Sequence, residues 1–258
     1  MELKEKYKKE FLDIYGDRIF VYLKFTKSEE WAKDIINGRL YMNPIGFYRD
    51  LELKDGMKGQ GDSQELRLVS ENIQIKLITH NPEKEIPLDS KKVKFQYTND
   101  QHTPIFCIMG IRVRDLVVCD YDEQSIKVRF PFNASDVEHL KRDFGEFVVM
   151  VSPEGFECAV HNTLTSQNLN GFFKEVIYCD PDSLERQEDF LKGSIRRYLY
   201  KNIDFAYQKE FRLVLDEKIT SGKFFDVGSL SDFSHILKVE DFLDCCITMT
   251  YNLEDEDE

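Results

Sequence analysis

Cysteine is scarce in this sequence, and its placement excludes the common cysteine-based sites. The 258 residues contain six cysteines, which form no C-x-x-C pair and have no histidine at zinc-finger spacing. We therefore predict no metal site and interpret the cysteines as reduced, buried thiols.

Long apolar runs are missing as well. Nowhere do about 18 apolar residues follow one another, and the charged residues after Met1 leave no apolar stretch suited to a signal peptide. We expect a soluble, cytoplasmic protein that has no membrane partner.

The sequence also lacks the motifs of several large enzyme classes. It has no G-x-S-x-G, no H-E-x-x-H and no EF-hand spacing, and the glycine-containing segment 59–62 lacks the Gly-Lys-Ser/Thr end of a P-loop. These absences argue against serine hydrolases, zinc proteases, P-loop NTPases and Rossmann enzymes.

Basic residues are too few for a protein whose main partner is a bare nucleic acid. Lys and Arg number 35 against 48 Asp and Glu, which gives a net charge of −13 and a pI of about 5.0. Affinity for a phosphate backbone comes from many basic contacts, so we do not expect this partner. Part of the charge lies in the acidic run at 253–258, which we interpret as a solvated tail.

Apolar and aromatic residues, in contrast, are plentiful. Hydrophobic residues make up 41% of the chain, which includes 20 Phe and 12 Tyr, enough for a buried core of ordinary size. No fixed-period repeat or linker-like segment divides the chain. We predict one domain over residues 1–258.

The first 42 residues predict two helices and two strands. Apolar spacing indicates a short helix near 3–16 and a strand over 18–26, whose polar face carries Tyr22, Lys24 and Thr26. Ser28 is placed to cap a second helix that ends near Gly38, and a short strand follows at 39–42.

Strands dominate the rest of the chain. Alternating patterns predict them at 66–79, 93–97, 105–113, 125–130, 146–151, 156–161, 172–179, 223–227 and 245–251. Asp180-Pro181 predicts one late helix that ends near Asn202. Many short strands without helices between them favour antiparallel pairing, so the predicted class is a strand-rich, mostly antiparallel α+β fold with N-terminal helices.

The late strand over 207–215 has the clearest polar face. Gln208, Glu210 and Arg212 alternate with apolar residues, which is typical of a half-buried strand. Glu210 beside Arg212 is open to two interpretations: a site, or only an ion pair.

These segments resemble a known family. The run 21–26, together with the run 35–44 that contains Gly38-Arg39-Leu40-Tyr41, resembles the opening motif of bacterial ADP-ribosyltransferase-like proteins. The segments 47–52 and 59–65 are similar to a large bacterial and phage family that is associated with abortive infection, and late in the chain 176–178 and 207–212 resemble the same family. The middle third of the chain is similar only in its rhythm of strands.

The resemblance implies a split β-sandwich that holds NAD between the early and late strands. In such a fold Glu210 takes the place of the transferase glutamate and Tyr41 stacks against nicotinamide. A carboxylate is needed because cleavage of the bond between nicotinamide and ribose passes through an oxocarbenium-like cation.

The remaining cofactor contacts implied by the resemblance come from the two polar strand faces and one arginine beyond them. They are Tyr22, Lys24, Thr26, Arg49, Gln208 and Arg212. Lys24 stands where these enzymes use His or Arg, and lysine pairs with phosphate without the planar fork of arginine.

Three functions remain open at this stage. The first is an NAD-dependent mono-ADP-ribosyltransferase or NAD glycohydrolase that acts as an effector in conflict between phage and bacterium, with a macromolecular target. The second is a catalytically inactive protein on the same scaffold that triggers or blocks a defence system by protein contact. The third is an unrelated β-rich nuclease or regulatory domain. Tyr41 and Glu210 favour the first, whereas Lys24 and the acidic composition favour the second.

Overall fold

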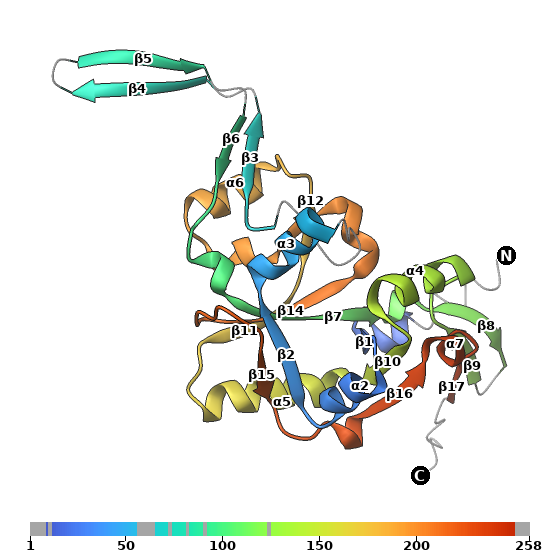
Figure 1. The fold of residues 1–258 in the computed structure, drawn as a ribbon. Helices are drawn as coiled ribbons and strands as arrows, with labels where there is room; N and C mark the ends of the chain where they lie inside the picture. Colours follow the sequence, from blue (N-terminus) through green and yellow to red (C-terminus); the bar gives the residue numbers. More distant parts are fainter. Residues whose placement is uncertain are drawn as a thin grey trace, which may run out of the picture.

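The computed structural model describes residues 9, 12–55, 65–71, 74–80, 83–89, 92–122 and 125–250. Most of the predicted opening helix at 3–16, the glycine-containing loop at 56–62 and the acidic tail at 253–258 lie outside the described residues. The described chain is an α+β protein with mostly antiparallel sheets, which confirms the predicted class (Figure 1).

The main sheet has eight strands, and every described pairing within it is antiparallel. Six strands follow one another in the order β11-β14-β7-β1-β10-β16, and β2 joins β7 while carrying β15 on its other side. The strands are β1 (Ile19–Thr26), β2 (Arg39–Pro44), β7 (Pro104–Arg112), β10 (Phe147–Val151), β11 (Gly171–Glu175), β14 (Glu210–Leu215), β15 (Lys223–Asp226) and β16 (Ser234–Lys238).

The early segments fold as predicted. The alternation that favours a strand gives β1, and helix α2 (Glu29–Ile36) begins where the Ser28 side chain accepts a hydrogen bond from the Trp31 amide. Gly38 then adopts φ +79°, a conformation that costs glycine little, and the chain turns directly into β2. Helix α3 (Ile45–Asp55) follows β2 without a break.

Strand β7 pairs with β14 along one edge. Along its other edge it pairs with β1 near one end and with β2 near the other. Strand β1 pairs with β7 as far as Met109, and β2 pairs with it only at Pro104 and Ile105. Within the described chain, residues 106–108 therefore face no strand on that edge. This gap between β1 and β2, called the split below, is where the candidate site lies.

Helices cover both faces of the sheet. Helices α4 (Ala134–Phe144) and α7 (Val239–Leu243) bury apolar residues against Val21 and Leu23 of β1. Helices α2 and α5 (Pro153–Ser166) pack in a second cluster around Tyr22, on the other side of the sheet (Figure 1).

Helix α5 overturns one prediction, because residues 156–161 were expected to form a strand. Ser152 caps the helix by accepting a hydrogen bond from the Gly155 amide, and Pro153 occupies the first turn. The apolar residues that suggested a strand, Phe156 and Val160, instead fall on one buried helical face.

The predicted late helix is also shorter than expected. Helix α6 (Leu184–Leu191) begins after Ser183 and is followed by a 3₁₀ turn, η3 (Ile195–Leu199), and then by a short strand, β13 (Tyr200–Asn202). Another 3₁₀ segment, η4 (Ile203–Gln208), leads into β14 through Lys209, which adopts the left-handed conformation at φ 42°. Strand β14 therefore begins at Glu210 rather than at Tyr207.

Smaller sheets flank the main one. Strand β12 (Ile177–Cys179) pairs in parallel with β13, and β8 (Val117–Tyr121), β9 (Ser125–Arg129) and β17 (Cys246–Thr250) form an antiparallel sheet.

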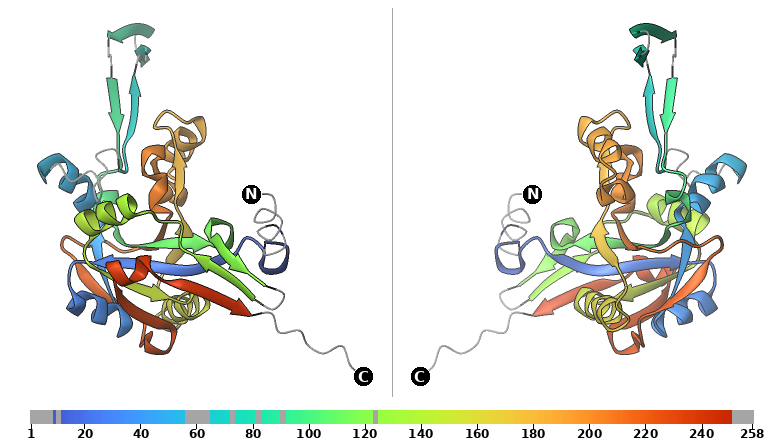
Figure 2. Two further views of the ribbon diagram at one scale, coloured as in Figure 1. Left: turned by 90° about the vertical axis from the view of Figure 1, so that its right-hand side faces the viewer. Right: turned by 90° about the vertical axis from the view of Figure 1, so that its left-hand side faces the viewer.

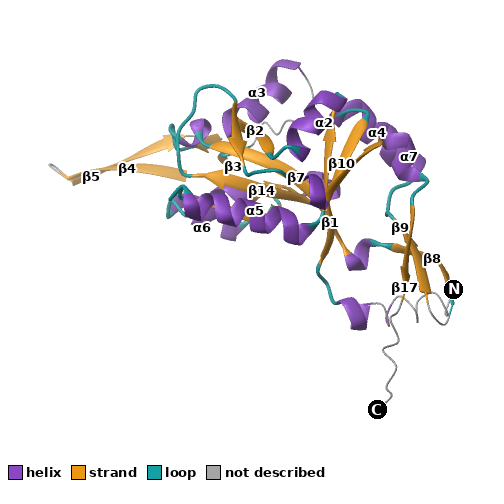
Figure 3. Ribbon diagram, turned by 90° about the horizontal axis from the view of Figure 1, so that it is seen from below, coloured by secondary structure: helices purple, strands orange, loops and turns teal. Residues whose placement is uncertain are grey.

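Two successive ribbons, β3 (Leu68–Glu71) with β6 (Lys92–Phe95) and β4 (Gln74–His80) with β5 (Glu83–Asp89), form an arm. The arm stands clear of the body, at the opposite end of the molecule from β8, β9 and β17 (Figures 2 and 3). No helix among the described residues is both long and apolar enough to cross a bilayer.

Candidate functional site

A cavity of about 680 Å³ opens at the split in the main sheet. Its walls come from the early elements β1, α2, β2 and α3, and its floor from β7, β13, η4 and β14, so it joins segments that are far apart in the sequence. A volume of this size is typical of a small-molecule site.

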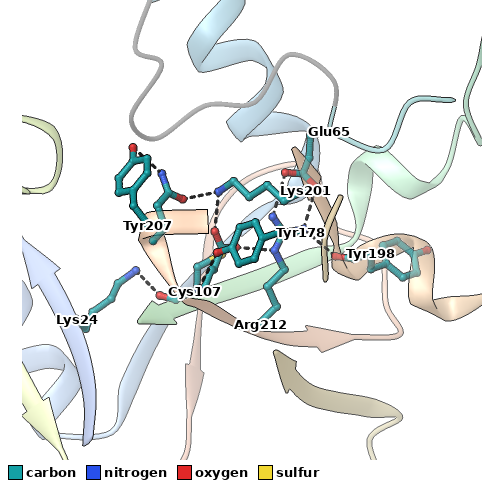
Figure 4. A network of polar contacts seen from close by, with 10 residues as sticks. Lys24, Glu65, Cys107, Tyr178, Tyr198, Lys201, Tyr207 and Arg212 are labelled. Atoms are coloured by element: carbon teal, nitrogen blue, oxygen red, sulfur yellow. Dashed lines mark hydrogen bonds and ion pairs between the residues drawn. The ribbon is translucent and has the colours of Figure 1, made fainter. Parts of the chain in front are cut away.

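The floor of the cavity is a buried cluster of four charged side chains, Glu65, Lys201, Glu210 and Arg212 (Figure 4). Their side chains are only 1–8% exposed. The two carboxylates and two cations balance one another, which is the condition under which buried charges are tolerated.

Glu210 stands at the centre of the floor, and each of its carboxylate oxygens meets a cation. Oε1 accepts a hydrogen bond from Arg212 Nε at 2.5 Å, and Oε2 accepts one from Lys201 Nζ at 2.6 Å. The backbone amide of Glu210 donates to the Tyr178 hydroxyl at 2.8 Å. Both the backbone and the side chain of Glu210 are therefore fixed.

Arg212 connects the floor to two other segments. Its Nη1 and Nη2 donate to the two oxygens of Glu65 at 2.8 and 3.0 Å, which is the bidentate geometry that arginine favours. Nη1 also donates to the backbone carbonyl of Tyr198 at 2.7 Å. Arg212 is 1% exposed and every one of its nitrogens is engaged.

The charge of Glu210 is set by these partners. Burial by itself raises the pKa of this carboxyl, but the charges and hydrogen bonds of Arg212 and Lys201 outweigh burial and hold the pKa well below its usual range. Burial also raises the pKa of the neighbouring Cys107 thiol to about 12. Glu210 is thus ionised at physiological pH, whereas Cys107 stays a neutral thiol.

Lys24 enters the cavity from the opposite side, through the split. Its Nζ donates to the backbone carbonyl of Cys107 at 2.6 Å and lies 4.8 Å from the centre of the Phe106 ring. The Lys24 ammonium therefore binds a backbone carbonyl at the split, on the part of the β7 edge that pairs with neither β1 nor β2. Burial lowers the pKa of Lys24, while Cys107 and Glu210 act in the opposite direction.

Four exposed aromatic side chains, Trp31, Tyr41, Phe47 and Phe224, form the rim of the cavity. Between 43% and 54% of each residue is exposed, and the Tyr41 and Phe224 rings meet edge to face with centroids 5.1 Å apart. Exposed rings of this kind are typical surfaces for stacking with a planar ligand.

The cavity is locally basic although the protein is acidic. Five basic residues and three acidic residues line it: Lys24, Lys27, Arg39, Lys201 and Arg212 against Asp34, Glu65 and Glu210. Arg39 pairs with Asp34 at 2.8 Å and the floor is neutral, so Lys24 and Lys27 are the excess charge. In the described part of the chain no carboxylate lies within ion-pair distance of either. The cavity thus suits an anionic ligand.

The structure brings six of the eight predicted site residues together. Glu210 and Arg212 form the floor with Gln208 beside them, and Lys24, Thr26 and Tyr41 line the opposite wall or the rim. The predicted half-buried strand is more enclosed than expected, because all six residues of β14 are buried.

Tyr22 and Arg49 do not line the cavity. Tyr22 is 1% exposed and packs among Phe156, Phe173 and Phe211 on the face of the sheet that α5 covers. Its hydroxyl donates to Glu157 at 2.6 Å, so it is a core residue with a satisfied polar group.

Arg49 lies outside the cavity because its guanidinium turns toward other partners. Its Nε donates to Asp50 at 3.2 Å and its Nη2 to Gln101 at 3.4 Å. Arg49 therefore lies outside the cavity lining, and its role in binding a cofactor stays a prediction.

Lys201 and Glu65 are site residues that the sequence did not reveal. Lys201 lies in a segment predicted as helix, and Glu65 lies 147 positions from its partner Arg212. No spacing rule connects such positions, and the observed strand β13 (Tyr200–Asn202) replaces the end of the predicted helix. In the described chain, no three His, Cys, Asp or Glu side chains are arranged to hold a metal ion.

No family model, curated protein or solved structure matches this chain. The geometry of the cavity, together with the resemblance seen in the sequence, is the basis for the functional proposal that follows.

Proposed function

We propose that the cavity binds NAD and that Glu210 promotes cleavage of its nicotinamide–ribose bond, in ADP-ribosyl transfer or in NAD hydrolysis. One observation carries this proposal: a buried, ionised carboxylate lies at the floor of a basic cavity with an aromatic rim. A fixed negative charge in a water-poor site is what a developing ribosyl cation requires.

The chemistry is a substitution at the anomeric carbon of the nicotinamide ribose. The bond from this carbon to the pyridinium nitrogen breaks, and its electron pair neutralises nicotinamide. Glu210 stabilises the cation that develops on the ribose. Water or an acceptor group then forms the new bond at the anomeric carbon and releases one proton.

The other walls of the cavity match the remaining parts of NAD. The rim offers aromatic surfaces to the planar bases, and the excess positive charge of Lys24 and Lys27 suits the pyrophosphate. The acceptor and the setting, an effector in conflict between phage and bacterium, rest on the sequence resemblance alone.

The test is an assay of purified protein with labelled NAD, alone and in a cell extract. We expect nicotinamide release or label transfer, and we expect Glu210→Gln to lower it by about 10²- to 10³-fold, the usual cost of removing one electrostatic contact. Glu188→Gln is the matched control, because Glu188 is an exposed residue of α6 paired with Lys192. Turnover that persists in Glu210→Gln would contradict the role of this residue.

A second candidate, binding without catalysis, is favoured by a specific contact pattern. Both oxygens of Glu210 already meet cations, and the Lys24 ammonium already donates to a backbone carbonyl. A protein that binds NAD or a related anion and acts by protein contact fits this arrangement. Calorimetry separates the two: saturable NAD binding without any turnover supports the second candidate.

A further inference from the structure

The small parallel sheet β12–β13 holds Glu210 from outside the main sheet. Tyr178 and Lys201 occupy the same register position on its two strands. From this position the Tyr178 hydroxyl accepts a hydrogen bond from the Glu210 amide, and the Lys201 ammonium donates to the Glu210 carboxylate (Figure 4). The paired residues Tyr178 and Lys201 thus hold both the backbone amide and the side-chain carboxylate of Glu210.

The Lys201 ammonium is itself held in place. Besides Glu210, it donates to Gln208 Oε1 at 2.6 Å and lies 5.1 Å from the centre of the Phe205 ring. Gln208 in turn donates to the Tyr207 hydroxyl at 3.2 Å. Segment η4 therefore supports Lys201, which is only 4% exposed.

A charge count shows why the floor needs this lysine. Arg212 forms a bidentate pair with Glu65, so that pair is already neutral. Lys201 is the second cation of the floor, and without it the four-residue cluster keeps two carboxylates and one cation. Burial penalises such an excess negative charge, which a carboxyl relieves by taking up a proton.

We propose that Lys201 is a positioning residue that fixes the orientation and the negative charge of the Glu210 carboxylate. This inference rests on the proposed function for its catalytic meaning. Each carboxylate oxygen has two lone-pair directions. Lys201 and Arg212 occupy one direction on each oxygen, which leaves a direction on each for the hydroxyl groups of a bound ribose.

The first test measures Glu210 directly and does not depend on turnover. In protein labelled with ¹³C at the glutamate carboxyl carbons, the Glu210 signal is identified by its loss in Glu210→Gln and is then followed against pH. We expect its titration midpoint to rise by about one pH unit or more in Lys201→Met, as expected on loss of an adjacent cation. Lys201→Arg, which keeps the charge, should stay closer to wild type.

Other titratable and charged groups also surround Glu210, so a matched control is needed. They are Lys24 of β1, Tyr48 of α3, Cys107 of β7, Tyr178 of β12, Arg212 of β14 and, through Arg212, Glu65. Lys192→Met removes an exposed lysine of α6 and should leave the midpoint of Glu210 unchanged. A midpoint that does not move in Lys201→Met overturns the proposal.

The second test uses turnover of NAD. We expect Lys201→Met to lower kcat about tenfold or more, to change KM little, and to move the acid limb of the pH profile upward, with partial rescue by Lys201→Arg. A faster Lys201→Met enzyme overturns the proposal, because Lys201 would then compete with substrate for Glu210. If wild type shows no turnover, the proposed reaction fails while the carboxyl titration still decides the role of Lys201.

A double variant guards against misfolding. Lys201→Met leaves the buried negative charge of Glu210 without its lysine partner. Adding Glu210→Gln removes that negative charge as well, so the remaining pair of Arg212 and Glu65 is neutral. We expect the double variant to unfold at a higher urea concentration than Lys201→Met alone. A lower urea midpoint for the double variant than for Lys201→Met would contradict the view that Lys201 is needed to neutralise the floor.

Discussion

The floor and the rim of the cavity are built in opposite ways. The floor residues Glu65, Lys201, Glu210 and Arg212 are buried and joined by short ion pairs, whereas the rim residues Trp31, Tyr41, Phe47 and Phe224 are about half exposed. The floor is needed for the fold as well as for any chemistry, because its charges must be neutralised before the sheet can close over them. The exposed rim residues contribute little to the stability of the fold and are available to contact a ligand.

The largest expected effect follows from removing the arginine of the floor. Arg212→Met leaves Glu65 and Glu210 buried with only Lys201 between them, so we expect the free energy of unfolding to fall by about 3–5 kcal/mol. Urea denaturation measures this loss. Arg142→Met is the control, because Arg142 is exposed and pairs only with its neighbour in sequence Asp143 among the described contacts, and we expect no measurable change in the free energy of unfolding. Similar losses of stability in the two variants would contradict the claim that the charges of the floor are needed for the fold.

The floor should also respond to acid. The pKa of Glu210 is lower in the folded protein than in the unfolded chain, so its ionised form stabilises the fold above the unfolded pKa of about 4.3, and this contribution is lost as pH falls below that value. We therefore expect the difference in free energy of unfolding between wild type and Glu210→Gln to shrink by about 1.4 kcal/mol per pH unit below pH 4. Urea titrations at several pH values measure it, and a constant difference would contradict the ionised state of Glu210.

The rim should lose affinity rather than stability. Trp31→Ala removes a stacking surface and should weaken NAD binding by about 1–3 kcal/mol, while the free energy of unfolding changes by less than about 0.5 kcal/mol because Trp31 is 54% exposed. Calorimetry and urea denaturation measure the two quantities. Leu184→Ala, an equally simple truncation at an exposed residue of α6, should affect neither.

Trp31 also offers a direct signal, because it is the single tryptophan of the chain. NAD that stacks at the rim should change its fluorescence emission with the same Kd as calorimetry gives. Unchanged emission at saturating NAD would place the ligand away from the rim.

The smallest effect is expected at the mouth of the cavity. Lys27 is exposed, so Lys27→Gln should weaken NAD binding by less than about 1 kcal/mol, and the loss should disappear at high salt. Lys33→Gln on α2 removes the same charge outside the cavity lining and serves as its control. Equal effects of the two substitutions would show that the mouth responds only to overall charge.

Local patterns predicted those parts of the fold in which the side chains nearest in sequence decide the structure. The alternation in β1 and the Ser28 cap of α2 are such cases. The prediction of a strand at 156–161 is wrong because the apolar residues of this segment fit a strand and a helical face alike. The helix is decided by its start, where Ser152 caps it and Pro153 occupies the first turn. The first residues of the predicted strand 207–215 were wrong because Lys209 turns through a left-handed conformation that alternation does not report.

The site was predictable to the extent that it lies on single strands. Lys24 and Thr26 follow from the alternation of β1, and Glu210 and Arg212 from that of β14. Alternation places Tyr22 on the same face as Lys24, but it does not show where α5 covers that face. Glu65 and Lys201 depend on contacts between distant segments, which no local pattern contains.

The contact between Lys24 and Cys107 has a consequence for how the site tolerates mutation. The acceptor of the Lys24 ammonium is a main-chain oxygen, which every amino acid supplies. Replacing the Cys107 side chain by another that fits its volume therefore leaves the anchor of the ammonium intact. The path of the β7 backbone therefore determines where the Lys24 ammonium lies. Substitutions along β7 should disturb this contact less often than they would disturb a contact between two side chains.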